Sequence, residues 1–381
     1  MMPVQQLPDA GVTEGIPRTH ARTSSLLLLP KHSDLHTHPE HSSMSHPEQK
    51  SALNIVMGCM TFGAEGAEGC RIHDPEEVGA ILDVFQAHGH HELDTARLYC
   101  FGTSEEMLAT VEWKKRGLAM GTKLWPTALW KMPNIAQITH SPEDLRKYFE
   151  ESLKALKTDC IDLWYLHGPD RSVPYEVTLK AVDELHREGK FKRFGLSNYM
   201  SWEVAEIVGI CRASGYIQPT VYQGIYNAVH RAVEPELFPC LRKFGIAFYE
   251  YNALAGGLFT GRYHSIHDAV PPGSRFDPDR LIGKGFRSHY WKEPYFAALA
   301  VLEPVVQKHG LTLAEVALRW MSHHSLLRRE HGDAIIIGAS SLKHVEQNLI
   351  DLEKGPLPEE VVKALDEAWS SVKGVASNYF L

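Results

Sequence analysis

The feature that most constrains the fold of this chain is an alternation of strand-like and helix-like segments from residue 54 to the C-terminus. Short apolar segments are separated by amphipathic patterns of helical length, as in residues 75–89, 141–157, 174–190 and 201–215. Strands separated by helices pair in parallel, and eight of them suit a (β/α)8 barrel, the TIM barrel. The predicted strands are Ile55–Met60, Glu92–Asp94, Leu118–Lys123, Ile161–His167, Lys192–Ser197, Thr220–Gln223, Ile246–Tyr251 and Ala334–Gly338.

A doubly wound open sheet is the main alternative fold, and the first turn argues against it. Such a sheet binds a dinucleotide at a glycine-rich turn that directly follows its first strand. Residues 58–63 read Gly-Cys-Met-Thr-Phe-Gly and lack the G-x-G-x-x-G spacing of that turn. We therefore expect a closed barrel.

Polar residues recur where the predicted strands end. The active site of a (β/α)8 barrel lies at the C-terminal ends of its strands, so residues at these positions should gather around one site. They are Asp94, Lys123, His167, Ser197, Asn198, Gln223, Asn252 and Ser340.

The stretch HELDTARLYCFGTSEE, residues 91–106, adds Tyr99 to this set. A phenol has a pKa of about 10 and donates a proton poorly near neutrality unless its anion is stabilised. Lys123 could be the stabilising cation, Asp94 could hold the ammonium, and His167 could donate a hydrogen bond to a substrate oxygen. Such a set would protonate a carbonyl oxygen, and because no side chain supplies hydride, it would need a nicotinamide cofactor. Taken singly, these residues could equally form a structural ion pair and a core histidine.

Composition and charge exclude several partners. The chain has 381 residues and a formal net charge of -8, and no basic stripe indicates a nucleic-acid partner. Its longest purely aliphatic run, Leu26 to Leu29, is far shorter than the roughly 20 residues of a membrane span. Its 6 cysteines form no CxxC pair, so no zinc site or disulfide framework is indicated. We expect a soluble protein of a reducing compartment, the cytoplasm, although organelle targeting by the N-terminal extension stays open.

Residues 1–50 are rich in Pro, Ser, Thr and His and lack sustained periodicity, which predicts a disordered extension before a barrel at residues 51–381. The extension contains the motif Ser33-Asp34-Leu35-His36-Thr37-His38 after an aliphatic run. Histidines two apart on a strand could bind zinc or manganese, as in barrel hydrolases. Pro30 interrupts that strand, and the region is His-rich as a whole, so we expect no metal site.

The set Asp94, Tyr99, Lys123 and His167 resembles the catalytic tetrad of the aldo-keto reductases. The sequence motifs are most similar to those of the aflatoxin-aldehyde reductase-like branch. The shared motifs, in the same order, are ELDTA..Y...SE, YLH.PD, GLSN, YN.LAGGL.TG.Y, SSL..VEQNL and a final NYF. The resemblance covers the whole chain except its N-terminal tail. It implies that the Tyr is the general acid, the Lys lowers its pKa, the Asp orients the Lys and the His positions the carbonyl. It also implies a TIM barrel, NADPH as cofactor, a small-molecule carbonyl substrate and, from the branch, a homodimer.

Cofactor contacts carry over from the family by position. Ser197, Asn198 and Gln223 match residues that hold the carboxamide, and Tyr251 either stacks on the nicotinamide ring or is a core tyrosine. The resemblance assigns the remaining positions to the rest of the dinucleotide. These are Asn252, Leu254, Gly256, Arg262, Arg275, Ser340 and His344, together with Asn348 at the adenine.

Departures from the family bear on specificity. His344 stands where the family commonly has Arg or Gln, which offers less to a 2′-phosphate. Phe286 and His289 stand where relatives that reduce short carboxylated aldehydes have Tyr and Arg, and Leu381 stands where those relatives have an Arg. We therefore expect an aromatic or dicarbonyl substrate. The candidate pocket residues are Met60, Trp125, Trp130, Phe286, His289, Tyr290 and Phe380, with core packing as the alternative for each.

Three functions from different classes follow from the sequence. The first is NADPH-dependent carbonyl reduction, with a specialised role in secondary metabolism or detoxification. The second is a cofactor-binding accessory or sensor protein with little turnover. The third is a metal-dependent hydrolase that uses His36 and His38.

Overall fold

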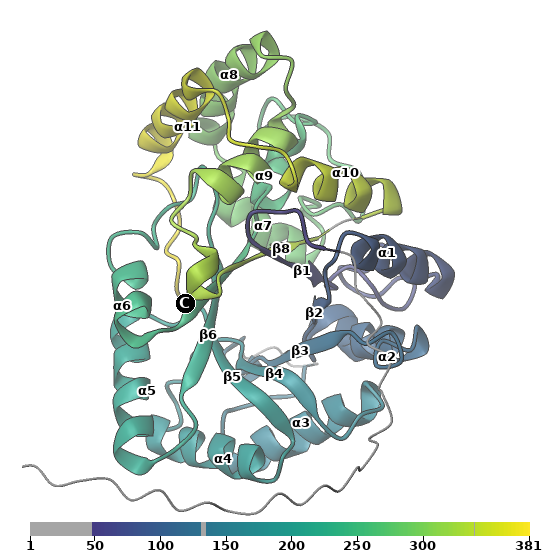
Figure 1. Cartoon of the computed structure of the whole chain (residues 1–381), viewed down its shortest axis with the longest axis vertical. Coiled ribbons are helices and arrows are strands. Elements are labelled where there is room, and N and C mark those ends of the chain that lie inside the picture. The colour runs from purple at the N-terminus through teal and green to yellow at the C-terminus, as the bar shows by residue number, and fades with distance from the viewer. Residues whose placement is uncertain (1–47, 131–134, 339) are drawn as a thin grey trace, which may run out of the picture. The chain divides into compact units, whose positions relative to one another are not determined.

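Eight parallel strands close into one barrel, with neighbours in the order β1 to β8 (Figure 1). The structure is a computed structural model that describes residues 48–130, 135–338 and 340–381. The prediction of a (β/α)8 barrel is confirmed, and every predicted strand is present, with its ends within about two residues of the expected ones. The strands are β1 Asn54–Gly58, β2 Glu92–Asp94, β3 Ala119–Leu124, β4 Ile161–Leu166, β5 Phe191–Ser197, β6 Pro219–Ile225, β7 Ala247–Tyr251 and β8 Ala334–Ile337.

Capping residues mark the ends of several helices. The Asp74 side chain accepts a hydrogen bond from the Glu76 amide before the first helix, and Ser141 caps the third helix in the same way through Asp144. Gly215 ends the fifth helix in the left-handed conformation that favours glycine. The helices are α1 Pro75–Ala87, α2 Thr103–Thr110, α3 Pro142–Ala155, α4 Tyr175–Arg187, α5 Ser201–Ser214, α6 Leu237–Phe244, α7 Leu281–Tyr290, α8 Glu293–Lys308, α9 Leu313–His323, α10 Leu342–Leu352 and α11 Glu359–Val372, with 3-10 turns η1 Tyr99–Gly102, η2 Thr127–Trp130, η3 Ala255–Thr260 and η4 Arg329–His331.

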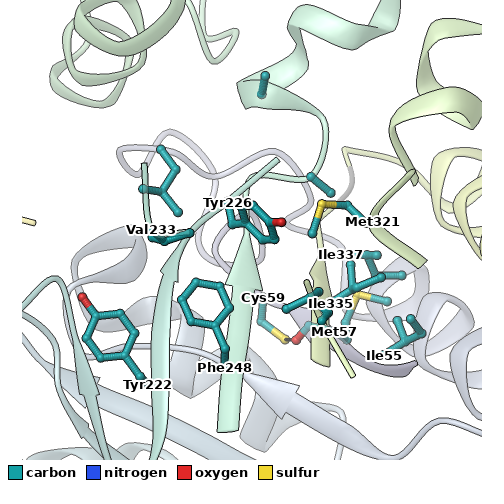
Figure 2. Packing of buried hydrophobic residues seen from close by; sticks show 14 of the residues in the cluster. Ile55, Met57, Cys59, Tyr222, Tyr226, Val233, Phe248, Met321, Ile335 and Ile337 are labelled. Carbon is teal, nitrogen blue, oxygen red and sulfur yellow. Dashed lines mark hydrogen bonds between the residues drawn. The ribbon is translucent and has the colours of Figure 1, made fainter. Parts of the chain in front are cut away.

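Alternate residues of each strand separate two apolar layers. The inward-facing set fills the barrel and includes Val56, Leu163, Tyr165, Val221, Tyr249 and Ile336. The outward-facing set packs under the helices, and Figure 2 shows part of it, with Tyr222 of β6 beside Phe248 of β7 at 5.9 Å between ring centroids. Because side chains alternate across a strand, β1, β4, β6, β7 and β8 contribute to both layers.

Tyr165 makes a close contact inside the barrel that requires a glycine on the next strand. It lies opposite Gly195 in the β4–β5 register, and a Cβ on Gly195 would lie 2.3 Å from the Tyr165 ring. Deeper in the barrel, Arg193 donates to Glu92 at 2.8 Å and to the Tyr249 hydroxyl at 3.2 Å. Because the interior is packed here, we expect the active site at the C-terminal ends of the strands.

The segment after α11 returns to the C-terminal end of the barrel. The Leu381 amide donates to the Asn198 carbonyl at 3.1 Å, at the end of β5. The Ser377 hydroxyl lies 2.6 Å from Nδ1 of His289, and Lys292 donates to the Val375 carbonyl at 2.8 Å. The tail is therefore held by α7, by the start of α8 and by the edge of the predicted site.

Two expectations concern residues outside the described part of the chain. The predicted extension lies almost entirely within residues 1–47, and the His36 and His38 motif lies there too. Within the residues that the structure describes, no helix combines the length and the apolar character needed to cross a bilayer.

Candidate active site

A buried ion pair lies at the centre of the site. The Lys123 ammonium, at the end of β3, donates to Oδ1 of Asp94 at 2.6 Å and to the Thr95 carbonyl at 2.6 Å. The Lys123 residue is 0% exposed and Asp94 is 4% exposed. The ammonium also lies 5.7 Å from the ring centroid of Tyr165, so an aromatic face supports it from below. A charge this deep needs all of these partners.

The Tyr99 hydroxyl is the next polar group beyond the ammonium. It lies 3.4 Å from Nζ of Lys123, and that nitrogen lies 4.7 Å from the ring centroid of Tyr99. The loop turns sharply after this residue, with φ of 50° at Cys100 and 53° at Phe101, in the left-handed region. Such backbone is costly for side chains larger than glycine and is concentrated at functional sites.

An ionic brace holds the loop in this shape. Arg97 donates to Oε2 of Glu105 at 2.7 Å, and the Thr122 hydroxyl of β3 donates to Oε1 of the same carboxylate at 2.7 Å. The brace ties both sides of the turn to the strand that carries Lys123.

His167 completes the predicted set. Its ring packs edge-on against the Tyr99 ring at 5.7 Å and against the Trp125 ring at 5.1 Å. Burial, and then the Lys123 charge, lower the pKa of His167 well below its ordinary value. The imidazole is therefore neutral at neutral pH and can donate one hydrogen bond without bringing in a charge.

The pKa shifts of Asp94, Lys123 and Tyr99 differ in part from those expected from the sequence. Burial raises the pKa of Asp94 and lowers that of Lys123, while each partner opposes the shift of the other. Burial also raises the pKa of Tyr99 well above its ordinary value; Asp94 raises it further, and Arg275 lowers it. The lowering expected from Lys123 is not what the structure gives: desolvation dominates the pKa of Tyr99, and the cation that opposes it is Arg275.

The amides expected at a carboxamide lie beside the tetrad. Nδ2 of Asn198 donates to the His167 carbonyl at 2.8 Å and to Oγ of Ser197 at 3.0 Å, and its Oδ1 accepts the Tyr251 hydroxyl at 2.9 Å. Nε2 of Gln223 donates to Oδ2 of Asp94 at 2.8 Å. Asn198, Ser197 and Tyr251 thus form one group at the His167 carbonyl, and Gln223 forms a separate contact with Asp94.

A group of cations gathers where phosphates were expected. His344, in the first turn of α10, lies 3.1 Å from the Ser340 hydroxyl through Nδ1. Burial, followed by the positive charges of Arg262, Lys343 and Arg71, lowers its pKa. The N-terminus of a helix and several cations together favour an anion.

The glycine-rich loop lies between these two groups. Asn252 has a φ of 74° and its carbonyl accepts from Asn227, and Leu254 packs partly buried against the core. Gly256 has a φ of 67°, and a Cβ there would lie 2.5 Å from the Phe286 ring, so the loop needs glycine at this position. Asn348 is buried in α10 at 7% exposure.

Arg71 is a residue that sequence reasoning missed. It lies on the segment between β1 and α1, donates to the Gly273 carbonyl at 3.1 Å, and lines a pocket with Met60 and Arg275. Arg275 lies over the Phe286 ring, 4.9 Å from its centroid, and burial, with the charge of Arg71, lowers its pKa to about 10. A lone arginine in an irregular loop carries no sequence signal, so only the fold could reveal it.

The expected pocket residues divide into three groups. Met60 lines the pocket just described, and Trp125 packs on both His167 and Trp130, the latter at 5.5 Å. His289 contacts the tail through Ser377, and Phe380 packs on Tyr379 at 5.0 Å within that tail. Tyr290 is a correction: it is 0% exposed and bonded to Asn227, because it faces the core from α7, and it is no pocket wall.

Comparisons with known proteins identify the family of this chain. The model of the aldo/keto reductase family matches residues 54–370. An aldo-keto reductase of Pseudocercospora fijiensis is 50% identical over 79% of this chain and 100% of its own length. The aldo-keto reductase pigE of Monascus ruber is 44% identical over 87% of this chain and 98% of its own, and the human aflatoxin B1 aldehyde reductase member 4 is 43% identical over 89% and 100%.

The chain belongs to the aldo/keto reductase family, and the match extends over most of its barrel. Its similarity to the aflatoxin B1 aldehyde reductases confirms the branch that the sequence motifs indicated. The protein is therefore an oxidoreductase of this family.

We predict that Lys123→Met lowers the free energy of unfolding by about 3–5 kcal/mol at pH 8, because it leaves the Asp94 carboxylate buried without its cation. Without that cation the folded-state pKa of Asp94, which burial already raises, rises further above its unfolded value. The variant therefore loses stability as pH rises. Its free energy of unfolding should lie closer to that of the wild-type protein at pH 5 than at pH 8. Denaturant unfolding of the two proteins at both pH values measures this difference.

The control for this prediction is the double variant Asp94→Asn/Lys123→Met, which removes the stranded charge. It should recover part of the lost stability at pH 8. A deficit that is the same at both pH values, and that Asp94→Asn does not relieve, would contradict a buried ion pair.

Proposed function

We propose that the protein reduces an aldehyde or ketone to the alcohol with NADPH. The observation that carries the proposal is the row of contacts from Asp94 through the Lys123 ammonium to the Tyr99 hydroxyl, with His167 against the Tyr99 ring. The family and its aldehyde reductase members support carbonyl reduction in general terms. The cofactor and the substrate class are part of the proposal.

Each residue of the row has a distinct task in the reduction. Tyr99 donates its proton to the carbonyl oxygen as that oxygen becomes negative, and the neutral His167 imidazole donates a hydrogen bond to the same oxygen. Lys123 stabilises the phenolate that remains, and Asp94 keeps the ammonium at hydrogen-bond distance. A phenol this deeply buried needs that cation when it gives up its proton, since desolvation alone would make it a very weak acid.

The described residues fit a bound nicotinamide dinucleotide. Asn198, Ser197 and Gln223 present amide and hydroxyl groups at the carboxamide position, and Tyr251 is tied to Asn198 through its hydroxyl. When bound, NADPH would supply the hydride that no side chain can provide. Arg262 and Arg71, whose charges reach His344 in the first turn of α10, would hold its phosphates.

Preference for NADPH over NADH is proposed despite His344. The cations whose charges reach this histidine, Arg262, Lys343 and Arg71, replace the single Arg or Gln that the position commonly has. An extra phosphate would meet several positive charges and the N-terminus of α10.

The proposed substrate is an uncharged aromatic or dicarbonyl compound. Trp125, Trp130 and Phe286 supply apolar surface near His167 and the pocket. The two permanent cations expected of a carboxylate clamp are replaced by His289 and Leu381. Arg71 and Arg275 also line the pocket with Met60, and we propose that the cofactor phosphates occupy both, which leaves a carboxylated aldehyde without a cationic partner.

We predict that Tyr99→Phe lowers carbonyl reduction at least about 100-fold while cofactor binding persists, because the variant keeps the ring and loses the acid. NADPH oxidation is followed over a panel of aldehydes, ketones and quinones, and binding is followed by quenching of protein fluorescence. If the wild-type protein binds NADPH but reduces nothing in the panel, the accessory or sensor function replaces this proposal.

We predict a higher kcat/KM with NADPH than with NADH at the same carbonyl concentration. Arg262→Met should lower the NADPH value more than the NADH value, because it removes a cation that the additional phosphate of NADPH would meet and keeps an apolar stem of similar length. Equal initial rates with the two coenzymes in the wild-type protein would end the proposed preference.

We predict that 4-nitrobenzaldehyde is reduced with a higher kcat/KM than 4-carboxybenzaldehyde, a matched aromatic aldehyde that carries a carboxylate. Succinic semialdehyde should be the poorest of the three, since it lacks both the aromatic surface and a cationic partner. An equal or better value for either acid would show that a cation in the pocket reaches the substrate.

A further inference from the structure

Gln223 makes a contact that its expected role in cofactor binding does not explain. It is 2% exposed on β6, and its Nε2 donates to Oδ2 of Asp94 at 2.8 Å. The two residues are 129 positions apart in the sequence. Asp94 ends β2, so the contact joins two strands that are not neighbours in the barrel.

The closed order of the strands shows what this contact spans. In a ring of eight, β2 and β6 are four places apart in either direction, which makes them opposite strands. The Gln223 amide therefore reaches across the interior to the carboxylate at the far wall. A contact of this kind holds the carboxylate from the side that Lys123 does not occupy.

Gln223 and Lys123 each donate a hydrogen bond to a different oxygen of the Asp94 carboxylate. Lys123 donates to Oδ1 at 2.6 Å, and Gln223 donates to Oδ2 at 2.8 Å. A hydrogen bond to the ionised form of a buried carboxylate favours that form, here against the desolvation that raises the pKa of Asp94. If either donor were lost, a proton of the Lys123 ammonium would shift toward the Asp94 carboxylate. The positive charge beside Tyr99 would then decrease.

We propose that Gln223 is a positioning residue of the reaction, which holds Asp94 ionised and directed at Lys123 and so keeps a charged ammonium beside Tyr99. The inference rests on the proposed carbonyl reduction and deepens it. A glutamine is suited to this task because its Nε2 can serve Asp94 while its Oε1 remains an acceptor for a carboxamide. The residue expected to bind the cofactor thus also supports the proton donor.

The matched variants are Gln223→Leu and Ser197→Ala. Leucine keeps much of the volume of Gln223 and removes its donor, whereas Ser197 is also expected at the carboxamide but hydrogen-bonds Asn198. Both variants should raise the dissociation constant for NADPH, measured by fluorescence quenching. Only Gln223→Leu should alter the ionisation of the pair.

Kinetics at saturating NADPH separate the two roles. In Gln223→Leu we expect kcat to fall about 10-fold, within the 10–100-fold range typical of outer partners of a reactive group, and the basic limb of the kcat profile to move to higher pH. In Ser197→Ala the basic limb should stay in place. Gln223→Glu should recover activity as pH falls, because a protonated carboxyl can again donate to Asp94.

A stability measurement tests the contact in the protein without cofactor or substrate. Below the folded-state pKa of Asp94 the carboxylate is neutral, and the Gln223 donor adds little. The loss of Tm in Gln223→Leu should therefore grow from pH 5 to pH 8. A residue that only fills space would lower Tm equally at both.

The outcomes differ for the two proposals. If Gln223→Leu changes only the NADPH dissociation constant, with an unmoved basic limb and a loss of Tm that does not depend on pH, the positioning role is overturned. If the wild-type protein reduces no carbonyl in the panel, the proposed function fails, whereas the Tm comparison still reports whether Gln223 supports ionised Asp94.

Discussion

The buried ion pair of Asp94 and Lys123 is the interaction on which the site depends. Two charges removed from water cost several kcal/mol each unless every lone pair and proton is matched. Here the ammonium meets a carboxylate, a backbone carbonyl and an aromatic face, and the carboxylate meets a second donor in Gln223. The pair comes from β2 and β3, and its partners Tyr165 and Gln223 come from β4 and β6 of the same closed barrel, which surrounds the two charges.

This requirement explains features that otherwise seem unrelated. Gly195 lacks a side chain because the Tyr165 ring, which lies below the ammonium, occupies the space where a Cβ would lie. The left-handed turn at Cys100 is stabilised by an ionic brace whose carboxylate, Glu105, also binds β3. His167 stays neutral because the Lys123 charge and burial both oppose its protonation. The Lys123 ammonium lies 3.4 Å from the Tyr99 hydroxyl, where a phenolate would form, and Arg275 adds a second positive charge nearby.

The residues around the ion pair differ in how directly they contact it. Of the amides at the ends of β5 and β6, Gln223 bonds the ion pair directly, whereas Asn198 bonds the His167 carbonyl. The cations near His344 come from three separate segments. The apolar wall and the tail around Ser377 lie farther out, where substitutions such as His289 for an expected Arg can alter the substrate class.

The sequence by itself determined the alternation of strands and helices, the helix caps at Asp74 and Ser141, and the polar residues that follow each strand, because these depend on neighbours along the chain. Local pattern was enough to place Asp94, Tyr99, Lys123 and His167 at one end of a barrel. Only the tertiary structure decided that Gln223 bonds Asp94 across the interior, that Arg71 joins the cationic group, and that Tyr290 faces the core. These contacts depend on the closure and register of the barrel and on the paths of its loops, which join residues far apart in the chain and which no short segment encodes.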